Sequence, residues 1–422
     1  MQSLEGARRP QQRRLIVLTA VAVALLFAGI AARSPAASAG GVGKWTNLSG
    51  ATGSNLTQVG LVATPNGILH VAWIRDAATP GLQDLLYRTV NASGAFGAMQ
   101  VVQANWSVLN DPALVYDPSA AQLGIVFSGM RSTNPGEVYD GLTVTISSNG
   151  GASWALDPSG VFDPPGSSAY ASPISAIAAG GVQFSTWYGS DGVWVLRGVS
   201  GSTAAYDYQH SPTDLGNYGY YPNFGLDKNG TLWLVWASNG TGHSGLWADT
   251  VNQTTGAPVG PQVMLPNSTT SYGGAPQFDM MTSKVAVTGR PKGTGVYVAY
   301  TTGYPSTNKV RVWHLTTAKI TSTVVAKGSA EKGQTAIAAG PDGRIWVVWS
   351  QSSLSGRDRV YVRRSNTAAT AFGPAKYYST PAGYTGVYHL AAIVRHGKLD
   401  VLAHLGGTKG LATWHIQFKA PK

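Results

Sequence analysis

Aromatic side chains stand a few residues ahead of several strongly apolar, strand-like segments of this sequence. The set consists of Trp106, Tyr170, Tyr218, Tyr221, Tyr272, Tyr384 and Tyr388. Aromatic rings with polar tips can stack on the C–H faces of sugars while their polar atoms form hydrogen bonds. If the apolar segments surround a common axis, these rings meet at one opening and predict a carbohydrate-binding funnel. Packing between neighbouring loops would explain any single ring equally well.

Charged and polar side chains occupy loops that would open on the same side. They are Arg75, Asp76, Asp111, Arg131, Glu137, His243 and Arg357. Hydrolysis of a glycoside requires two carboxyl groups beside the bond, and the candidates are Asp76, Asp111, Glu137 and Asp191. Elimination from a uronate requires a base and a cation, for which the candidates are Tyr221, His243 and Arg131. No spacing favours either set, so the catalytic residues stay open.

The composition excludes several kinds of site. The sequence has no cysteine, which rules out disulfides, thiolate metal sites and a cysteine nucleophile. The eight histidines stand apart from one another and show no metal-ligand spacing. We therefore expect neither a metal nor a cofactor.

One phrase recurs along the chain and predicts the architecture. The clearest copies read VATPNGILHVAWI (62–74), GLDKNGTLWLVWA (225–237) and AAGPDGRIWVVWS (338–350). In each copy a dipeptide ending in glycine, suited to a two-residue hairpin, precedes a β-branched and aromatic run. Aromatic anchors at comparable places are 49 to 64 residues apart, a period typical of arrays of four-stranded sheets. The anchors are Trp73, Phe127, Trp187, Trp236, Tyr300 and Trp349.

Seven such units can be read, beginning near residues 57, 111, 172, 222, 276, 334 and 388. Strands with apolar residues on both faces need neighbours on both sides, and a ring of sheets supplies them. The sequence predicts an all-β β-propeller with seven four-stranded blades, six or eight being the alternatives. The seventh unit lacks a fourth strand. We expect the segment 43–49, ahead of the first unit, to supply that strand and to close the ring.

The turn over residues 145–157 carries a motif that points to a family. It reads TISSNGGASWALD, in which Ser147, Asn149, Gly151, Ser153 and Trp154 resemble the Asp-box, the repeat of bacterial neuraminidases. Asn149 stands where that family prefers Asp. In the motif a polar side chain binds backbone amides, glycine allows a left-handed turn and the aromatic residue packs between blades. The resemblance implies a sialidase-like propeller over about residues 44–418, and it implies architecture rather than activity.

Sialidase activity itself is not expected. The resembling enzymes carry an arginine triad, a Tyr/Glu nucleophile pair and an aspartate acid/base, and their first arginine lies in a Phe/Tyr-Arg-Ile-Pro motif. This sequence contains no such string, and beyond position 39 it has only two glutamates, Glu137 and Glu331.

The first 39 residues have the pattern of an export signal. Arginines precede an apolar run over residues 15–30, and Ala37-Ser38-Ala39 offers small residues to a signal peptidase. The alternative is an uncleaved membrane anchor, since the run and the two alanines after it are long enough to span a bilayer. We predict cleavage, and a single propeller domain over residues 40–422 outside the cytoplasm.

Net charge bears on the partner. The 422 residues include 30 Lys+Arg and 19 Asp+Glu; residues 1–39 hold five arginines and one glutamate, so the remainder carries +7. This excess is spread along the chain without a Lys/Arg run, which suits an anionic glycan better than a nucleic acid. We expect a secreted monomer that binds carbohydrate or another cell-surface polymer through the funnel. The alternatives are a glycoside hydrolase or polysaccharide lyase, and a protein-interaction scaffold.

Overall fold

The computed structural model consists of antiparallel β-strands, and the residues that it describes form no helix. Those residues are 42–131, 140–162, 173–189, 192–199, 207–211, 219–238, 245–268, 271–272, 275–276, 284–302, 308–353 and 356–419. The chain divides after Ala37 into two units, and all described residues belong to the second, Ser38–Lys422. The predicted signal peptide, residues 1–39, lies outside them. In the described part, no helix has the length and hydrophobicity that crossing a membrane requires.

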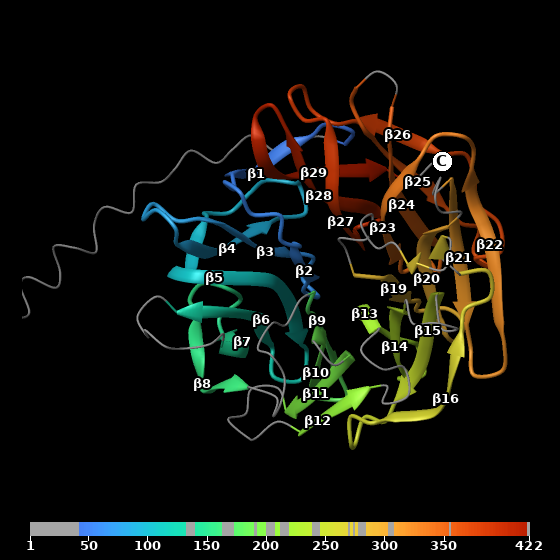
Figure 1. Cartoon of the computed structure of the whole chain (residues 1–422), viewed down its shortest axis with the longest axis horizontal. Coiled ribbons are helices and arrows are strands. Elements are labelled where there is room, and N and C mark those ends of the chain that lie inside the picture. The colour runs from blue at the N-terminus through green and yellow to red at the C-terminus, as the bar shows by residue number, and fades with distance from the viewer. Residues whose placement is uncertain are drawn as a thin grey trace, which may run out of the picture. The chain divides into compact units, whose positions relative to one another are not determined.

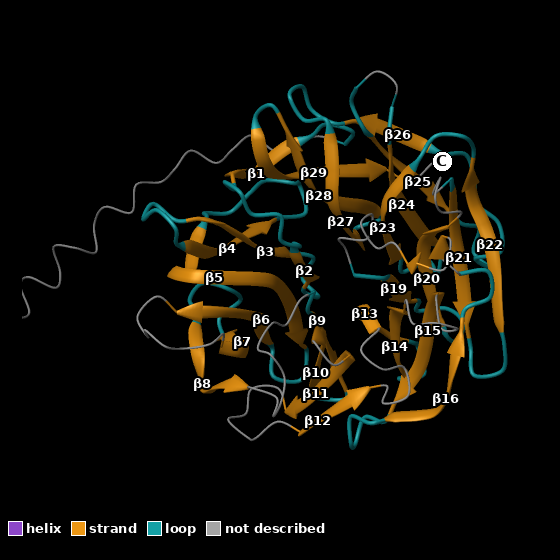
Figure 2. Ribbon diagram, viewed as in Figure 1, coloured by secondary structure: helices purple, strands orange, loops and turns teal. Residues whose placement is uncertain are grey.

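Sheets of hydrogen-bonded strands surround a common centre, so the fold is an all-β propeller (Figure 1, Figure 2). Five sheets have four strands each: β1 (Thr46–Ala51), β29 (Gly410–Lys419), β28 (Lys398–Gly407) and β27 (Gly386–Arg395); β9 (Ser175–Ala179), β10 (Val182–Gly189), β11 (Gly192–Val199) and β12 (Asp207–Ser211); β13 (Gly219–Leu226), β14 (Leu232–Ser238), β15 (Gly245–Val251) and β16 (Pro258–Met264); β19 (Ala286–Gly289), β20 (Val296–Thr302), β21 (Lys309–Leu315) and β22 (Ile320–Lys327); β23 (Lys332–Ala339), β24 (Ile345–Gln351), β25 (Arg359–Arg364) and β26 (Lys376–Ser379).

The other described strands form one large and one very small sheet. The large sheet has seven strands: β2 (Gly60–Ala63), β3 (Leu69–Asp76), β4 (Gln83–Val90), β5 (Gln100–Asp117), β6 (Gln122–Arg131), β7 (Asp140–Ser147) and β8 (Ala155–Phe162). The small sheet pairs β17 (Ser271–Tyr272) with β18 (Ala275–Pro276).

The prediction of seven separate four-stranded blades is wrong, because the described residues form five separate four-stranded sheets. The first two predicted units are joined by β5, which runs for 18 residues and pairs with both β4 and β6. Its register shifts between Asn110 and Ala113, where a bulge lets one strand bend from one sheet direction into the next. The fifth predicted start, near residue 276, is also displaced, because β18 occupies that position and the strand facing the centre is β19.

Glycine turns connect first and second strands, as the sequence predicts; Gly180-Gly181 and His396-Gly397 form two-residue hairpins with positive φ at both positions, but the loop type differs in the three clearest copies of the phrase. At Asn66-Gly67 only the glycine has a positive φ, +78°, and its N–H donates to the carbonyl of Thr64. The same arrangement recurs at Gly230 and Gly343. These are three-residue loops with glycine in the left-handed position, and not the two-residue hairpins that the dipeptides suggested.

The N-terminal strand lies at the edge of the sheet formed by β27, β28 and β29. β1 runs antiparallel to β29, with Thr46 opposite His415 and Asn47 opposite Trp414. Leu48 on the same strand is fully buried. The pairing supplies a fourth strand to that sheet; closure of a complete ring by it stays a prediction.

Sheets bury both faces against their neighbours. On β24, Trp346 packs in a cluster with Leu399 of the β27–β29 sheet, whereas Trp349 packs in another cluster with Val310 of the β19–β22 sheet. Successive strand residues point to opposite faces, so one apolar run fills two interfaces at once. All six predicted aromatic anchors are buried. The repeated phrase therefore builds the scaffold, and the loops between the copies are left to shape a site.

Candidate functional site

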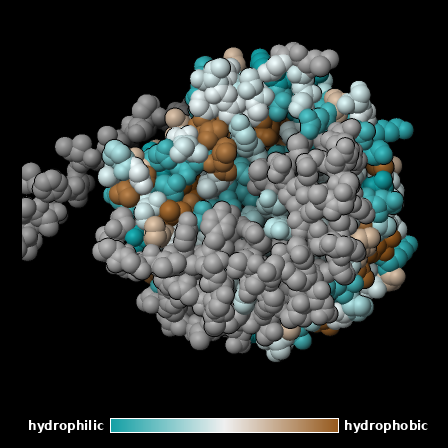
Figure 3. Space-filling view, in the orientation of Figure 1, coloured by the Kyte–Doolittle hydropathy of each residue, from teal (hydrophilic) through white to brown (hydrophobic). Residues whose placement is uncertain are grey.

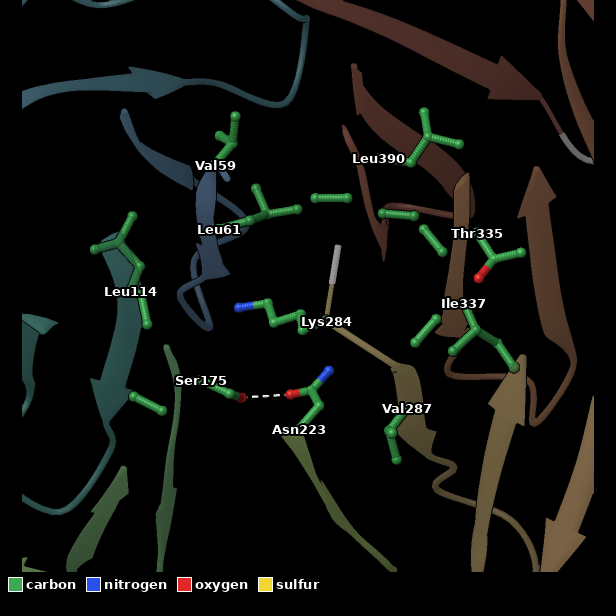
Figure 4. Close-up of a pocket in the computed structure, with 16 residues that line it drawn as sticks. Val59, Leu61, Leu114, Ser175, Asn223, Lys284, Val287, Thr335, Ile337 and Leu390 are labelled. Atoms are coloured by element: carbon green, nitrogen blue, oxygen red, sulfur yellow. Dashed lines mark hydrogen bonds between the residues drawn. The ribbon is translucent and has the colours of Figure 1, made fainter. Parts of the chain in front are cut away.

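A cavity of about 200 Å³ lies where the sheets converge, and we call it the central cavity. Residues of the strands closest to the centre line it, together with Val59 and Lys284 from the segments before two of these strands, and most of them are apolar. Figure 4 shows these side chains facing one another from several sheets. The polar members of the lining are Ser175, Asn223, Lys284 and Thr335.

Irregular strand pairing shapes the entrance to the central cavity. The register shifts near the start of β13, β23 and β27, and inside β5 where that strand bends from one sheet direction into the next. Two residues within these irregularities, Asp111 and Tyr221, have positive φ angles of +23° and +55°. Bulges re-aim side chains, and strained backbone at non-glycine residues clusters at functional sites. The entrance is therefore the first place to look for chemistry.

Lys284 precedes β19 and extends into the middle of the central cavity (Figure 4). Its Nζ donates to the carbonyl of Ile174, 3.1 Å away. The cavity leaves the residue some accessible surface, so it is half-buried, but protein surrounds the ammonium group. Burial lowers its pKa to about 8, against the opposing charge of Asp111. The group is thus a cation at neutral pH and loses its proton in mildly alkaline solution.

A short segment, Leu56–Gln58, ties two more polar side chains to the entrance. The backbone N–H of its last residue donates to Oδ1 of Asp111 over 2.6 Å. The carbonyl of its first residue accepts a hydrogen bond from Nε2 of His389. One segment thereby positions both a carboxylate and an imidazole.

The ring of His389 is held neutral and in a defined tautomer. Because a carbonyl can only accept, the Nε2 that faces Leu56 carries the proton and Nδ1 carries the lone pair. Burial and the charge of Lys284 lower the pKa of His389 to about 4, although the Leu56 hydrogen bond opposes them. Burial likewise lowers the pKa of His404, whose ring centroid lies 6.1 Å from that of His389, to about 3. At neutral pH both imidazoles are therefore uncharged.

Tyr221 joins this group through the backbone. Its carbonyl accepts from the N–H of Val285, the residue after Lys284, over 3.0 Å. Its phenol also interacts with that of Tyr300, whose pKa is raised first by burial and then by this neighbour. We call Asp111, Tyr221, Lys284 and His389 the mouth cluster. Among the described residues, no grouping of His, Asp and Glu resembles a metal site.

Two of the predicted funnel aromatics belong to the core. Trp106 and Tyr384 are only 4% and 6% exposed. They pack edge-on against Phe127 and Trp414, with ring centroids 5.3 and 5.2 Å apart. A ring so placed holds neighbouring strands together and offers no face to a sugar.

The other predicted aromatics have mixed positions. Tyr221 belongs to the mouth cluster, and Tyr388 is 38% exposed next to His389. Tyr272 lies on β17. Tyr170 and Tyr218 are outside the described residues. The structure thus brings one predicted aromatic into the mouth cluster and leaves a second exposed beside it.

Of the predicted charged residues, Arg75 and Asp76 serve local structure. Arg75 pairs with Asp84 at 3.2 Å. The carboxylate of Asp76 accepts from the backbone N–H of Ser54 at 2.9 Å and from the side-chain amide of Asn55 at 2.6 Å. Asp76 thereby fixes the chain immediately before the segment that holds the mouth cluster, and it acts on the entrance indirectly.

Two of the remaining predicted charged residues, Arg131 and Arg357, are among the described residues. The guanidinium of Arg131 lies 5.2 Å from the ring centroid of Trp106. Arg357 is half-buried ahead of β25. Glu137, Asp191 and His243 are outside the described residues.

The turn between β7 and β8 has the bonds that its sequence predicts. Ser147 Oγ donates to Asn149 Oδ1 and accepts from the N–H of Gly151, both over 2.9 Å. Asn149 Oδ1 also accepts from the N–H of Ser153 at 3.0 Å. Trp154 packs edge-on against a tyrosine of β4 at 4.9 Å between centroids. The turn is structural; its membership of the Asp-box family stays a prediction.

Sequence reasoning missed Lys284 and His389. The displaced start of the fifth unit hid Lys284, and His389 stands alone in the sequence. The signal that could have found them is positional. Lys284 precedes β19 and His389 lies near the start of β27, and both strands line the central cavity.

Comparison with known proteins identifies the fold. No family model matches the sequence, and no curated protein does. A solved polysaccharide lyase matches with 9% identity and a TM-score of 0.52, over 89% of this chain and 92% of that chain. The endosialidase of phage phi92 matches with 7% identity and a TM-score of 0.50, over 90% of this chain and 69% of that chain. At the level of the fold, the chain resembles the sialidase-like β-propellers.

Proposed function

We propose that this protein is a carbohydrate-active enzyme that cleaves a uronate-containing glycan by β-elimination at the entrance of the central cavity. The mouth cluster carries the proposal. The charge of Asp111 favours the protonated form of Lys284, the charge of Lys284 disfavours protonation of His389, and the carbonyl of Tyr221 accepts from the residue after Lys284. A cation, a neutral base and a phenol are the groups that this reaction requires.

Each group of the mouth cluster has a role in the reaction. Lys284 binds the uronate carboxylate and withdraws charge from the neighbouring carbon. Nδ1 of His389 removes the proton from that carbon. The electron pair of the C–H bond forms a carbon–carbon double bond while the bond from the next carbon to the glycosidic oxygen breaks. The phenol of Tyr221 donates a proton to the departing oxygen, and the product carries an unsaturated uronate at its new end.

Asp111 supports Lys284 instead of acting on the sugar. Its charge raises the pKa of Lys284 against the effect of burial and so keeps the ammonium protonated. Within the described residues Asp111 is the one carboxylate of the mouth cluster, whereas glycoside hydrolysis uses a pair. The fold is one that a polysaccharide lyase also uses. These observations favour elimination over hydrolysis.

The proposal is tested with the full chain and a panel of uronate polymers, namely polygalacturonate, alginate and hyaluronan. Product is followed by the ultraviolet absorbance of the unsaturated uronate. Lys284→Met should lower kcat/KM by about 10³-fold, because it removes the charge that stabilises the transition state. Lys292→Met, at an exposed lysine outside the cavity lining, is the matched control and should retain activity.

Two results would overturn the proposal. One is the absence of unsaturated product from every polymer. The other is a Lys284→Met variant that turns over as fast as the Lys292→Met control, with both variants unfolding thermally at the wild-type temperature.

Binding without catalysis is the second candidate function. The exposed ring of Tyr388 beside the mouth cluster favours it, since an exposed tyrosine can stack on a sugar. In that case Tyr388→Ala should weaken glycan binding by about tenfold, and no polymer should yield unsaturated product.

The site of action is also a proposal. The pattern of residues 1–39 supports export. We propose a secreted monomer. Antibody detection of the full chain in cell and medium fractions, with sizing of the secreted product, tests both points.

A further inference from the structure

A second cavity, of about 590 Å³, lies between the outer parts of two neighbouring sheets. One wall is formed by β21 and β22 and the other by β24 and β25, with Lys332 at the start of β23; Figure 1 shows β22 at the outside of the ring. We call it the inter-sheet groove. None of the central-cavity residues lines it.

The inter-sheet groove is strongly cationic. Its twelve lining residues include five basic side chains and no acidic one; the basic members are Lys309, Arg311, Lys327, Lys332 and Arg363. Elsewhere in the chain lysines and arginines are spread out, so this concentration is a property of the folded sheets. Like charges gathered on one surface raise the local potential and attract anions.

The contacts of these basic residues are with neutral groups. Arg363 donates to the carbonyl of Val325 at 2.5 Å, and Arg311 donates to the hydroxyl of Ser322 at 3.2 Å. Lys332 is only 2% exposed, and its Nζ donates to the carbonyl of a nearby alanine at 2.8 Å. Among the described residues, no carboxylate forms an ion pair with any of the five. The positive charge of the groove is therefore oriented by the protein but not neutralised by it.

Stacked aromatic rings form part of the same wall. Tyr361 lies between Trp349 and Tyr377, with ring centroids 5.4 and 5.0 Å apart. Tyr377 is 48% exposed and is covered on one side by the guanidinium of Arg359, 4.8 Å from its centroid. The face of Tyr361 is used within the stack, so the groove receives ring edges and hydroxyl groups.

From these observations we infer that the inter-sheet groove binds an anionic polysaccharide, through carboxylate or sulfate groups of a sugar chain. Exposed Lys309 and Lys327 pair with the carboxylate or sulfate groups of the polymer, and the tyrosine hydroxyls form hydrogen bonds with sugar hydroxyls. A nucleic acid is less suited, because single strands bind by stacking bases on free aromatic faces. The groove offers no such face at Tyr361.

This binding does not depend on the proposed reaction. The groove and the central cavity share no lining residue, although β23 contributes Lys332 to the groove and Thr335 to the cavity, so either can function without the other. If both operate, the groove retains one part of a polymer while another part reaches the central cavity. The effective concentration of the polymer at the mouth cluster would then rise without any new contact between the polymer and that cluster.

The experiment measures binding by titration calorimetry with the full chain and three polymers: polygalacturonate, dextran sulfate and uncharged dextran. The first two separate carboxylate from sulfate recognition. We expect at least one anionic polymer to bind and dextran not to bind. The double variant Lys309→Glu, Lys327→Glu should weaken anionic binding by about tenfold or more, because it reverses two charges in the groove. The control Lys228→Glu, Lys292→Glu makes the same change in net charge at exposed lysines outside both cavities.

Several results would overturn the inference. They are equal weakening in the two double variants, binding of uncharged dextran as tight as that of the anionic polymers, and no binding to any polymer. Tighter binding of a thymidine oligonucleotide than of either anionic polymer would assign the groove to nucleic acid. Thermal unfolding of both double variants near the wild-type temperature confirms that they are folded. If the wild-type chain binds an anionic polymer through the groove but yields no unsaturated product from any polymer, the proposed function is refuted and the inference about the groove stands.

Discussion

At the scale of single residues, the mouth cluster keeps a cation beside an uncharged base. Lys284 loses hydration in the central cavity, and burial lowers its pKa because the charged form is disfavoured. The same physical effect keeps His389 uncharged, since its charged form is also the disfavoured one. Lys284 is therefore protonated while His389 is neutral from about pH 4 to about pH 8.

Elimination activity should follow a bell-shaped pH profile set by these two residues. Below about pH 4 His389 is protonated and cannot accept a proton, and above about pH 8 Lys284 is neutral and cannot hold a carboxylate. Lys284→Arg should remove the alkaline limb and keep the acid limb, since guanidinium stays charged throughout. Initial rates across this range check the profile. An alkaline limb unchanged in Lys284→Arg would contradict the role given to Lys284.

At the scale of elements, regular strands carry the fold and their irregular ends carry the site. A strand that keeps its register sends each side chain to one of two packed faces. The bulges in β5 and β13 break that alternation at Asp111 and Tyr221. There Asp111 accepts from the N–H of Gln58, and the carbonyl of Tyr221 accepts from the N–H of Val285 while its ring packs beside the core.

The turn between β7 and β8 gives a sharp test of local geometry. Gly150 and Gly151 have φ angles of +70° and +89°, but a Cβ would meet nothing within 4 Å at Gly150 and would lie 1.9 Å from Tyr87 Oη at Gly151. Gly150→Ala should cost about 1 kcal/mol of stability, from the left-handed backbone. Gly151→Ala should cost about 3 kcal/mol of stability, because overpacking against Tyr87 adds to the cost of the left-handed backbone. Urea unfolding compares them, and equal losses would show that Tyr87 does not constrain the turn.

At the scale of the whole molecule, a buried charge network links the last sheet to the large one. Arg395 donates to both carboxylate oxygens of Asp400, at 2.7 and 3.0 Å. It also donates to the carbonyls of Gly67 and Val90, in the seven-stranded sheet, at 2.8 and 2.7 Å. Nε2 of His415 lies 2.7 Å from Asp400. These bonds join strands from opposite ends of the chain.

The network should make the fold sensitive to acid through Asp400. Burial alone raises the pKa of Asp400, but hydrogen bonds and charges from His415 and Arg395 outweigh it and bring the pKa to about 2, below the ordinary 3.8. A carboxyl group whose pKa is lower in the folded state than in the unfolded state stabilises the fold at pH values above its unfolded-state pKa. That contribution is lost as pH falls from about 4 to about 2.

Asp400→Asn should lower stability at neutral pH by about 3–5 kcal/mol, because Arg395 is left as a buried, uncompensated charge. The variant should also lose less stability than the wild type between pH 4 and pH 2. Thermal unfolding followed by circular dichroism measures both effects. Asp342→Asn, which removes two ion pairs whose shared carboxylate side chain is 39% exposed, is the control and should change little. Equal acid sensitivity in Asp400→Asn and wild type would contradict this account.

Hairpins and strands could be predicted because their signals lie within a dozen residues. Asn66-Gly67 followed by an apolar run is readable without knowing any distant contact, and Gly67 indeed has the left-handed φ that the turn needs. The continuity of β5 could not be predicted, since Asp111-Pro112 looks like the end of a loop. Only the packing of two neighbouring sheets shows that the chain bends there without interruption.

By itself, the sequence determined the class of fold, because repeated apolar runs and glycine turns are relations between neighbours along the chain. Only the tertiary structure decided which side chains meet. Asp111, Tyr221, Lys284 and His389 come from four different sheets or the segments leading into them. Their meeting depends on where each strand breaks register, and the burial of Trp106 depends on which neighbour covers it. Both are set by long-range packing, which no local pattern records.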